Sequence, residues 1–197
     1  PLGASVNVAG TVTVTADPVA YCEFGGTAYM AQAGTIFQWN GTTNWPTAGT
    51  VGSGTAITDL RAVGGYIVAC LGANKLLYSA NGTAYTQSAG TLSALDYITE
   101  IRGIAWGVGA TNKVYSTSDV TGAWTLQGTV GDSLFGFTDL YSCQDFLLIG
   151  KQDGLYSIDR DGAVYDVLGN YKLKPNANNF KYGAVFKGKV YLPAHND

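Results

Sequence analysis

Short apolar stretches alternate with glycine-containing turns along the chain, and none has the spacing of an amphipathic helix. The stretches are rich in Val, Ile, Tyr, Thr and Trp, which favour β-strands. Asn40-Gly41 and Asn81-Gly82 each separate two such stretches, and Asn-Gly is typical of a tight hairpin in which both turn residues have positive φ. The pattern therefore predicts an all-β protein built from short antiparallel hairpins.

These hairpins recur at a nearly constant interval. Their turn glycines, Gly41, Gly82, Gly122 and Gly162, are 41, 40 and 40 residues apart. An aromatic residue follows each turn glycine, and a second glycine follows the aromatic; the pairs are Trp45 with Gly49, Tyr85 with Gly90, Trp124 with Gly128, and Tyr165 with Gly169. A repeat of about forty residues with roughly four short strands is the size of one propeller blade. We therefore expect a β-propeller of about four to five four-stranded blades.

The repeat also predicts how the chain is divided. Blades are expected at 18–57, 58–98, 99–137 and 138–179, with a partial blade at 180–197. The segment 1–17 contains two β-like runs, at 5–8 and 11–15. Either these runs supply missing outer strands and close a five-bladed ring, or the segment is a linker and the chain is part of a longer propeller. The second arrangement has a small advantage, because the N-terminal runs lack the Asn-Gly-aromatic pattern.

The repeated hairpin resembles the Asp-box (BNR) motif of sialidase-like propellers, written Ser-x-Asp-x-Gly-x-Thr-Trp. Residues 79–85 are similar to a shortened form with Asn for Asp and Tyr for Trp, and residues 117–124 are similar to a form with one extra residue. The segments 38–45 and 157–165 are more degenerate. The resemblance implies that a short side-chain oxygen caps the turn, that the aromatic packs between blades, and that the motif lies on the outer rim. It supports the fold and implies little about activity.

Composition removes several classes of function. Charged residues make up only 13% of the chain and its net charge is -3, whereas nucleic-acid binding requires a basic surface. The apolar run at 66–71 is far shorter than the roughly 20 residues of a membrane-spanning helix, so membrane insertion is not expected. Cys22, Cys70 and Cys143 have no metal-ligand or redox spacing; each lies in an apolar, strand-like stretch and is interpreted as a small hydrophobe.

The sequence predicts no catalytic residue, no metal site and no cofactor. Its single histidine, His195, lies next to the end of the chain without a partner for zinc or acid–base chemistry. Sialidases bind the substrate carboxylate with three arginines, but Arg160 falls inside a hairpin turn here, away from Arg61 and Arg102. We therefore expect the protein not to be an enzyme.

Two acid–base pairs are the best candidates for ligand binding. Asp59 with Arg61 and Glu100 with Arg102 occupy the same phase of the repeat, before the strand expected to be innermost, and this loop lies near the channel mouth in most propellers. Alternation along a strand places the acid and base of each pair on one side. A structural alternative is that both pairs are salt bridges between blades. Trp106 departs from the glycine pattern and is a further candidate.

These features favour a non-catalytic propeller of an extracellular or virus-particle protein, such as a tail or fibre component. It would act through contacts with other protein subunits of a larger assembly, or through attachment to a host surface. Two alternatives remain open. One is a secreted carbohydrate-binding propeller that recognises surface glycans with one shallow site per blade. The other is a fragment of a sialidase-like glycoside hydrolase.

Overall fold

The computed structural model describes residues 17–194, except residues 43, 52–54, 73, 90–91, 93, 160–161, 170 and 172. The β-like runs at 5–8 and 11–15, and with them the proposed ring closure, therefore lie outside the described residues, as do Arg160 and His195. Within the described part, no helix is long and apolar enough to cross a membrane.

Sixteen strands form four antiparallel sheets of four strands each, in simple chain order. Blade 1 consists of β1 (Ala20–Phe24), β2 (Thr27–Gln32), β3 (Thr35–Gln38) and β4 (Thr47–Thr50). Blade 2 consists of β5 (Asp59–Val63), β6 (Tyr66–Leu71), β7 (Asn74–Ser79) and β8 (Thr86–Gln87). Blade 3 consists of β9 (Tyr97–Ile101), β10 (Ile104–Gly109), β11 (Lys113–Thr117) and β12 (Thr125–Thr129). Blade 4 consists of β13 (Phe137–Cys143), β14 (Phe146–Lys151), β15 (Gly154–Ile158) and β16 (Val164–Asp166).

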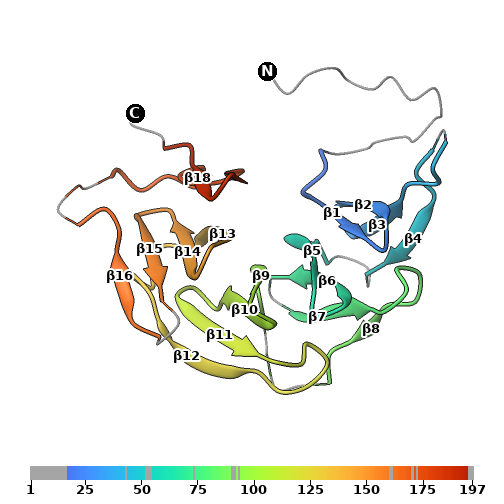
Figure 1. The fold of residues 1–197 in the computed structure, drawn as a ribbon, viewed down its shortest axis with the longest axis horizontal. Coiled ribbons are helices and arrows are strands. Elements are labelled where there is room, and N and C mark those ends of the chain that lie inside the picture. Colours follow the sequence, from blue (N-terminus) through green and yellow to red (C-terminus); the bar gives the residue numbers. More distant parts are fainter. Residues whose placement is uncertain are drawn as a thin grey trace.

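The four sheets fan around a common axis, which confirms the predicted all-β propeller with blades of about forty residues (Figure 1). The first strand of each sheet is the innermost, and β1, β5, β9 and β13 lie side by side in that order. A two-stranded hairpin, β17 (Ala184–Phe186) and β18 (Lys189–Tyr191), follows blade 4, and β17 contacts β13. β9 and β13 begin at Tyr97 and Phe137, slightly before the expected boundaries at 99 and 138.

The hydrophobic core is divided among the interfaces between neighbouring blades. Ile36 and Leu60 belong to the cluster between blades 1 and 2, whereas Trp124 of blade 3 packs into the cluster with Val68 and Leu76 of blade 2. Tyr85 of blade 2 lies against Gly49 of blade 1, where an added Cβ would stand 2.5 Å from the ring. The aromatic of the repeat therefore packs between blades at these two positions, as the sequence predicted.

The turns between the third and fourth strands are capped by side chains, but they are not tight Asn-Gly hairpins. Asn81 Oδ1 accepts hydrogen bonds from the backbone N–H groups of Thr83 and Ala84, both at 3.0 Å. Gly41 and Gly82 have positive φ, and neither Asn40 nor Asn81 does. The prediction of a two-residue turn is therefore wrong. The asparagine caps a longer loop with its side chain and does not need a left-handed backbone.

Candidate functional site

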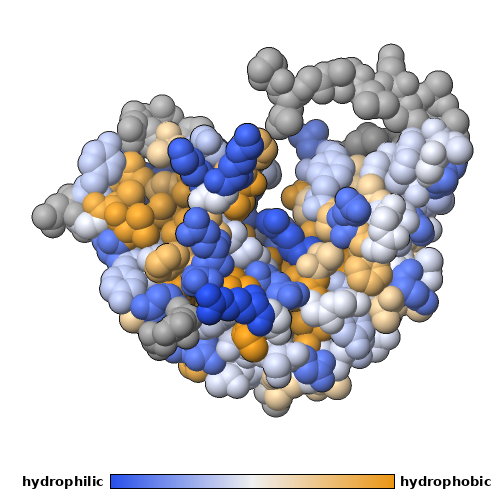
Figure 2. Space-filling model, in the orientation of Figure 1, coloured by the Kyte–Doolittle hydropathy of each residue, from blue (hydrophilic) through white to orange (hydrophobic). Residues whose placement is uncertain are grey.

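A pocket of about 510 Å³ lies on the axis of the propeller, where the innermost strands begin. Figure 2 shows the molecule hollowed on this face, with hydrophilic residues around the hollow. The pocket is bounded by the first residues of β1, β5, β9 and β13 and by the segment that leads into β17. Every blade therefore contributes to a single site, in contrast to the one shallow site per blade of the lectin alternative.

The same structural position of each repeat faces this pocket. A two-residue turn joins the first and second strands of each unit, beginning at Gly25, Gly64, Arg102, Gln144 and Lys187. The residue five positions before that turn lines the pocket in each case; these residues are Ala20, Asp59, Tyr97, Asp139 and Tyr182. A strand alternates its side chains between two faces, so a shared position relative to the turn gives a shared orientation.

Asp59 is almost fully buried at the start of β5, with 3% of its surface exposed. Its Oδ1 accepts hydrogen bonds from its neighbour Leu60 N–H at 2.9 Å and from Arg61 Nε at 3.1 Å. Its Oδ2 accepts one from Ile98 N–H of blade 3 at 3.1 Å. Burial raises the pKa of Asp59 to about 6, although the nearby Arg61 cation and the hydrogen bond from Ile98 act in the opposite direction.

Asp139 occupies the equivalent place in blade 4. Its Oδ1 accepts a hydrogen bond from Leu140 N–H at 2.8 Å, and its Oδ2 accepts from the Tyr141 hydroxyl at 2.8 Å and from Tyr182 N–H at 3.3 Å. The Tyr141 oxygen in turn accepts a hydrogen bond from Gly183 N–H at 2.8 Å. These contacts attach the segment before β17 to blade 4 and bring Tyr182 to the pocket.

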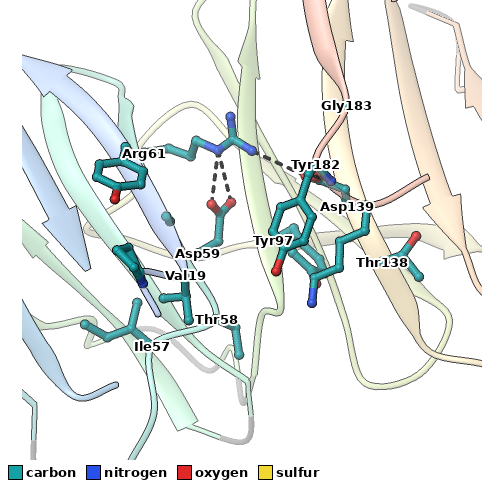
Figure 3. A pocket seen from close by; sticks show the side chains of 14 residues that line it. Val19, Ile57, Thr58, Asp59, Arg61, Tyr97, Thr138, Asp139, Tyr182 and Gly183 are labelled. Atoms are coloured by element: carbon teal, nitrogen blue, oxygen red, sulfur yellow. Dashed lines mark hydrogen bonds and ion pairs between the residues drawn. The ribbon is translucent and has the colours of Figure 1, made fainter. Parts of the chain in front are cut away.

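Arg61 connects the two carboxylates across the axis. Its Nε lies 3.1 Å from Asp59 Oδ1 and its Nη2 lies 3.3 Å from Asp139 Oδ1. Figure 3 shows the guanidinium between the two acids, which come from β5 and β13. The Arg61 side chain is 38% exposed. The alternation argument correctly predicted the Asp59–Arg61 ion pair, and the structure adds Asp139 as a second partner.

Glu100 and Arg102 do not join this site. Glu100 Oε2 accepts a hydrogen bond from Gly64 N–H at 2.6 Å, and Arg102 pairs with Asp145 of blade 4. Arg102 has a φ of 52° because it is the first residue of the two-residue turn, not a strand residue. Both residues therefore form contacts between blades, as in the structural alternative, and they do not line the pocket.

The apparent equivalence of Glu100 with Asp59 is wrong, and the reason is a difference in segment length. The inner turn of blade 2 begins at Gly64, 23 residues after the outer-turn glycine Gly41. The inner turn of blade 3 begins at Arg102, only 20 residues after the outer-turn glycine Gly82. The shorter segment moves the inner strand of blade 3 by three residues relative to the glycine landmarks. Tyr97, not Glu100, is consequently the blade 3 counterpart of Asp59.

Trp106 also lies outside the pocket lining. It is half-buried in the middle of β10, opposite Thr99, and packs against the cluster between blades 3 and 4. The structure therefore assigns packing to this ring.

Sequence reasoning missed Asp139, Tyr97 and Tyr182 as pocket residues. Thr138-Asp139-Leu140 repeats the pattern of Thr58-Asp59-Leu60, so the sequence did indicate that Asp139 is equivalent to Asp59. The acid–base pattern is broken in blade 4, because Tyr141 stands where Arg61 stands in blade 2.

Within the described residues, no group of three or more His, Cys, Asp or Glu side chains is placed to hold a metal ion. Both carboxylates are instead engaged by Arg61 and by backbone N–H groups.

The sequence matches no protein-family model and no curated protein. Among solved structures, a streptogramin B lyase superposes with a TM-score of 0.73 at 13% identity, over 90% of this chain and 62% of that one. Virginiamycin B lyase from Staphylococcus aureus superposes with a TM-score of 0.65 at 16% identity, over 82% of this chain and 57% of that one.

The extracellular domain of the putative one component system BT4673 from B. thetaiotaomicron gives a TM-score of 0.68 at 14% identity, over 90% of this chain and 26% of that one. The chain thus spans less than two thirds of each of these three longer proteins. At these identities the likeness concerns the fold alone. The chain is structurally similar to the propellers of these proteins.

Proposed function

We propose that this chain is a non-catalytic binding propeller of an extracellular or virus-particle protein. It attaches to a surface component through the axial pocket, and its outer surfaces contact other subunits of a larger assembly. The observation that carries this proposal is the saturation of the two carboxylates in the pocket by hydrogen-bond donors. A catalytic acid or base must be able to reach a reacting atom, whereas Asp59 and Asp139 are engaged by Arg61 and by backbone N–H groups.

The hydrogen bonds of the two acids support a binding role. Each oxygen of Asp59 and Asp139 accepts hydrogen bonds from at least one backbone N–H or hydroxyl group, and Arg61 bridges the two carboxylates. Such a network fixes the shape of the pocket before any ligand enters. Preorganisation of this kind lowers the entropic cost of binding.

Among the alternatives, a glycan is the partner that the pocket walls favour. Tyr21, Tyr97 and Tyr182 line the pocket, and aromatic rings next to polar groups suit the apolar faces and hydroxyl groups of a sugar. The hydrolase alternative has less support, because Arg61 is the only arginine among the described residues that line the pocket.

The proposal can be tested by binding of the whole chain to an array of immobilised neutral and acidic glycans. Tyr182→Ala removes one wall of the pocket, and Tyr191→Ala removes an exposed tyrosine outside it as a matched control. We expect Tyr182→Ala to weaken binding at least tenfold and the control to bind as the wild type does. Equal binding by both variants would place the attachment surface elsewhere, and pocket-dependent release of a sugar from the array would make the protein an enzyme.

A further inference from the structure

The units of this chain form an arc, and no described blade packs beyond either end of it. Figure 1 shows β1 at one end and the β17–β18 hairpin at the other, on opposite sides of the axial pocket. Pro18 and Val19 line the pocket from the first end, and Lys181 and Gly183 line it from the second. Direct contact between the two ends of one molecule would therefore eliminate the pocket.

Neighbouring blades pack through two defined faces of their inner strands. Cys22 and Phe24 of blade 1, three and one positions before its inner turn, pack into the cluster with Leu60 of blade 2. Leu60 lies four positions before its own inner turn and so faces the preceding blade. Leu140 of blade 4, at the same position, packs with Ile101 of blade 3 in the same way. Each unit thus has one face for the preceding blade and one for the next.

At the ends of the arc the same positions are exposed. Leu60 and Leu140 are fully buried, whereas Tyr21, also four positions before its inner turn, is 59% exposed. Val63, one position before the inner turn of blade 2, is 2% exposed, whereas Phe186 at that position of β17 is 58% exposed. Tyr21 therefore lies on a face that has no preceding blade among the described residues, and Phe186 lies on a face that has no next blade among them.

The exposed face of blade 1 is largely apolar. Tyr21 lies directly opposite Met30, and Met30 lies opposite Phe37, so these side chains form a row across β1, β2 and β3. Met30 is buried in this row, Phe37 is half-buried and Tyr21 is exposed. Glu23, two residues after Tyr21, is exposed on the same face. We call the surface formed by Tyr21, Glu23, Met30 and Phe37 the head face.

The exposed face of the β17–β18 hairpin combines an aromatic ring with lysines. Phe186 lies directly opposite Lys189, and both are exposed. Lys187 Nζ lies 5.3 Å from the centre of the Phe186 ring, so this cation belongs to the same surface. We call the surface formed by Phe186, Lys187 and Lys189 the tail face.

The two ends of the chain carry opposite charges. No Lys or Arg precedes Arg61, and residues 17–58 contain only the acids Asp17 and Glu23. Residues 167–196 contain five lysines and no acid. Opposite charges steer two surfaces together and fix their relative orientation, and exposed apolar surface beside them is typical of a protein interaction site.

We propose that the tail face of one molecule packs against the head face of a second copy of this chain, so that the copies associate head to tail. The contact uses the same two faces that join neighbouring blades, and it places Lys187 and Lys189 beside Glu23. It does not require the two walls of the pocket to meet. A head-to-tail contact of this kind produces rings or filaments. The inference rests on the proposed contacts with other subunits, and it names their surface and the partner.

Sedimentation velocity of the whole chain tests the inference. We expect association that increases with concentration up to about 100 μM, because even weak specific interfaces have roughly micromolar affinity. The association should weaken at least about threefold between about 0.1 M and about 1 M salt, because salt screens the attraction between the lysines and Glu23.

Two charge reversals make the test specific to the two faces. Glu23→Lys and Lys189→Glu each bring like charges together, so each variant alone should associate at least about tenfold more weakly than the wild type. An equimolar mixture of the two should associate as the wild type does, because Lys189 of the first variant meets Glu23 of the second. Lys113→Glu is the matched control, since it makes the same charge change at an exposed position of β11, outside both faces.

Three results would overturn the inference. A monomer at every concentration would mean that the two faces do not bind each other between copies. Association that both charge reversals leave unchanged would place the contact elsewhere on the molecule. Failure of the mixture to recover association would exclude pairing of the head face with the tail face. None of these results decides the attachment function of the pocket, which the glycan array with Tyr182→Ala tests separately.

Discussion

Arg61 Nη2 on β5 lies 3.3 Å from Asp139 Oδ1 on β13, although all of blade 3 separates the two strands in the chain. In addition to the packing between neighbours, this contact joins blade 2 to blade 4 directly across the axis. The pocket is therefore both the candidate binding site and a point at which non-neighbouring blades are held together.

Replacement of Arg61 by methionine should destabilise the protein by about 1–3 kcal/mol, because two nearly buried carboxylates lose their shared cation. The partial exposure of Arg61 keeps this value below that of a fully buried pair. Urea denaturation measures the change. Arg102→Met is the control, since its ion pair with Asp145 is exposed and should contribute less than about 1 kcal/mol. Equal effects of the two substitutions would contradict the structural role of Arg61.

Lys151 should be one of the most sensitive positions in the chain. Its side chain is fully buried at the end of β14, and its Nζ donates hydrogen bonds to the carbonyl oxygens of Thr111, Asp132 and Phe135. Lys151→Met leaves three carbonyls without their donor and should lower the free energy of unfolding by about 2–4 kcal/mol. Lys113→Met, at an exposed position of β11, should change it by less than about 0.5 kcal/mol. If Lys151→Met leaves the free energy of unfolding unchanged, water has replaced the ammonium group as the donor to these carbonyls.

Gly49 should not tolerate alanine, because Tyr85 of the next blade occupies the space of the new Cβ, 2.5 Å from the ring. The two blades must separate locally, and we expect a loss of about 1–3 kcal/mol in thermal or chemical unfolding. Gly136→Ala provides a comparison, since its Cβ would meet only the end of Gln152 at 3.5 Å. If both alanine variants unfold alike, the contact between Gly49 and Tyr85 does not limit the packing of blades 1 and 2.

The pKa of Asp59 predicts how stability depends on pH. Burial raises it to about 6 in the folded protein, above the ordinary value of 3.8. The folded state therefore binds this proton more tightly than the unfolded chain. The stability that the folded state gains from this protonated carboxyl is fully present below about pH 4 and is lost as pH rises through about 6.

Asp59→Asn removes this titration. Relative to that variant, the wild type should lose stability between about pH 4 and pH 6 and then stay constant, which unfolding curves at a series of pH values measure. If the free energies of unfolding of the wild type and of Asp59→Asn differ by the same amount across this pH range, Asp59 stays ionised in the folded protein.

The sequence alone determined the repeat and therefore the architecture. The chain has a period of about forty residues, short β-branched and aromatic stretches, and regularly spaced glycines. These features together predict a propeller, because each four-stranded blade must bury both faces against its neighbours. The packing of Tyr85 and Trp124 between blades was implied by the resemblance of the hairpin to the Asp-box motif. The ion pair of Asp59 with Arg61 followed from alternation along a strand.

Only the tertiary structure decided which residues meet at the axis. The segments that connect one blade to the next differ by up to three residues, so equal spacing in the sequence does not give equal positions in the ring. Glu100 has the right phase relative to the glycines but lies near the end of β9, outside the pocket. Tyr97 and Tyr182 reach the pocket at the position that Asp59 and Asp139 occupy in their own blades, although no acid marks them in the sequence. The contact of Arg61 with Asp139 joins residues 78 positions apart. Its partner is set by the way the four blades are arranged around the axis, which no local pattern encodes.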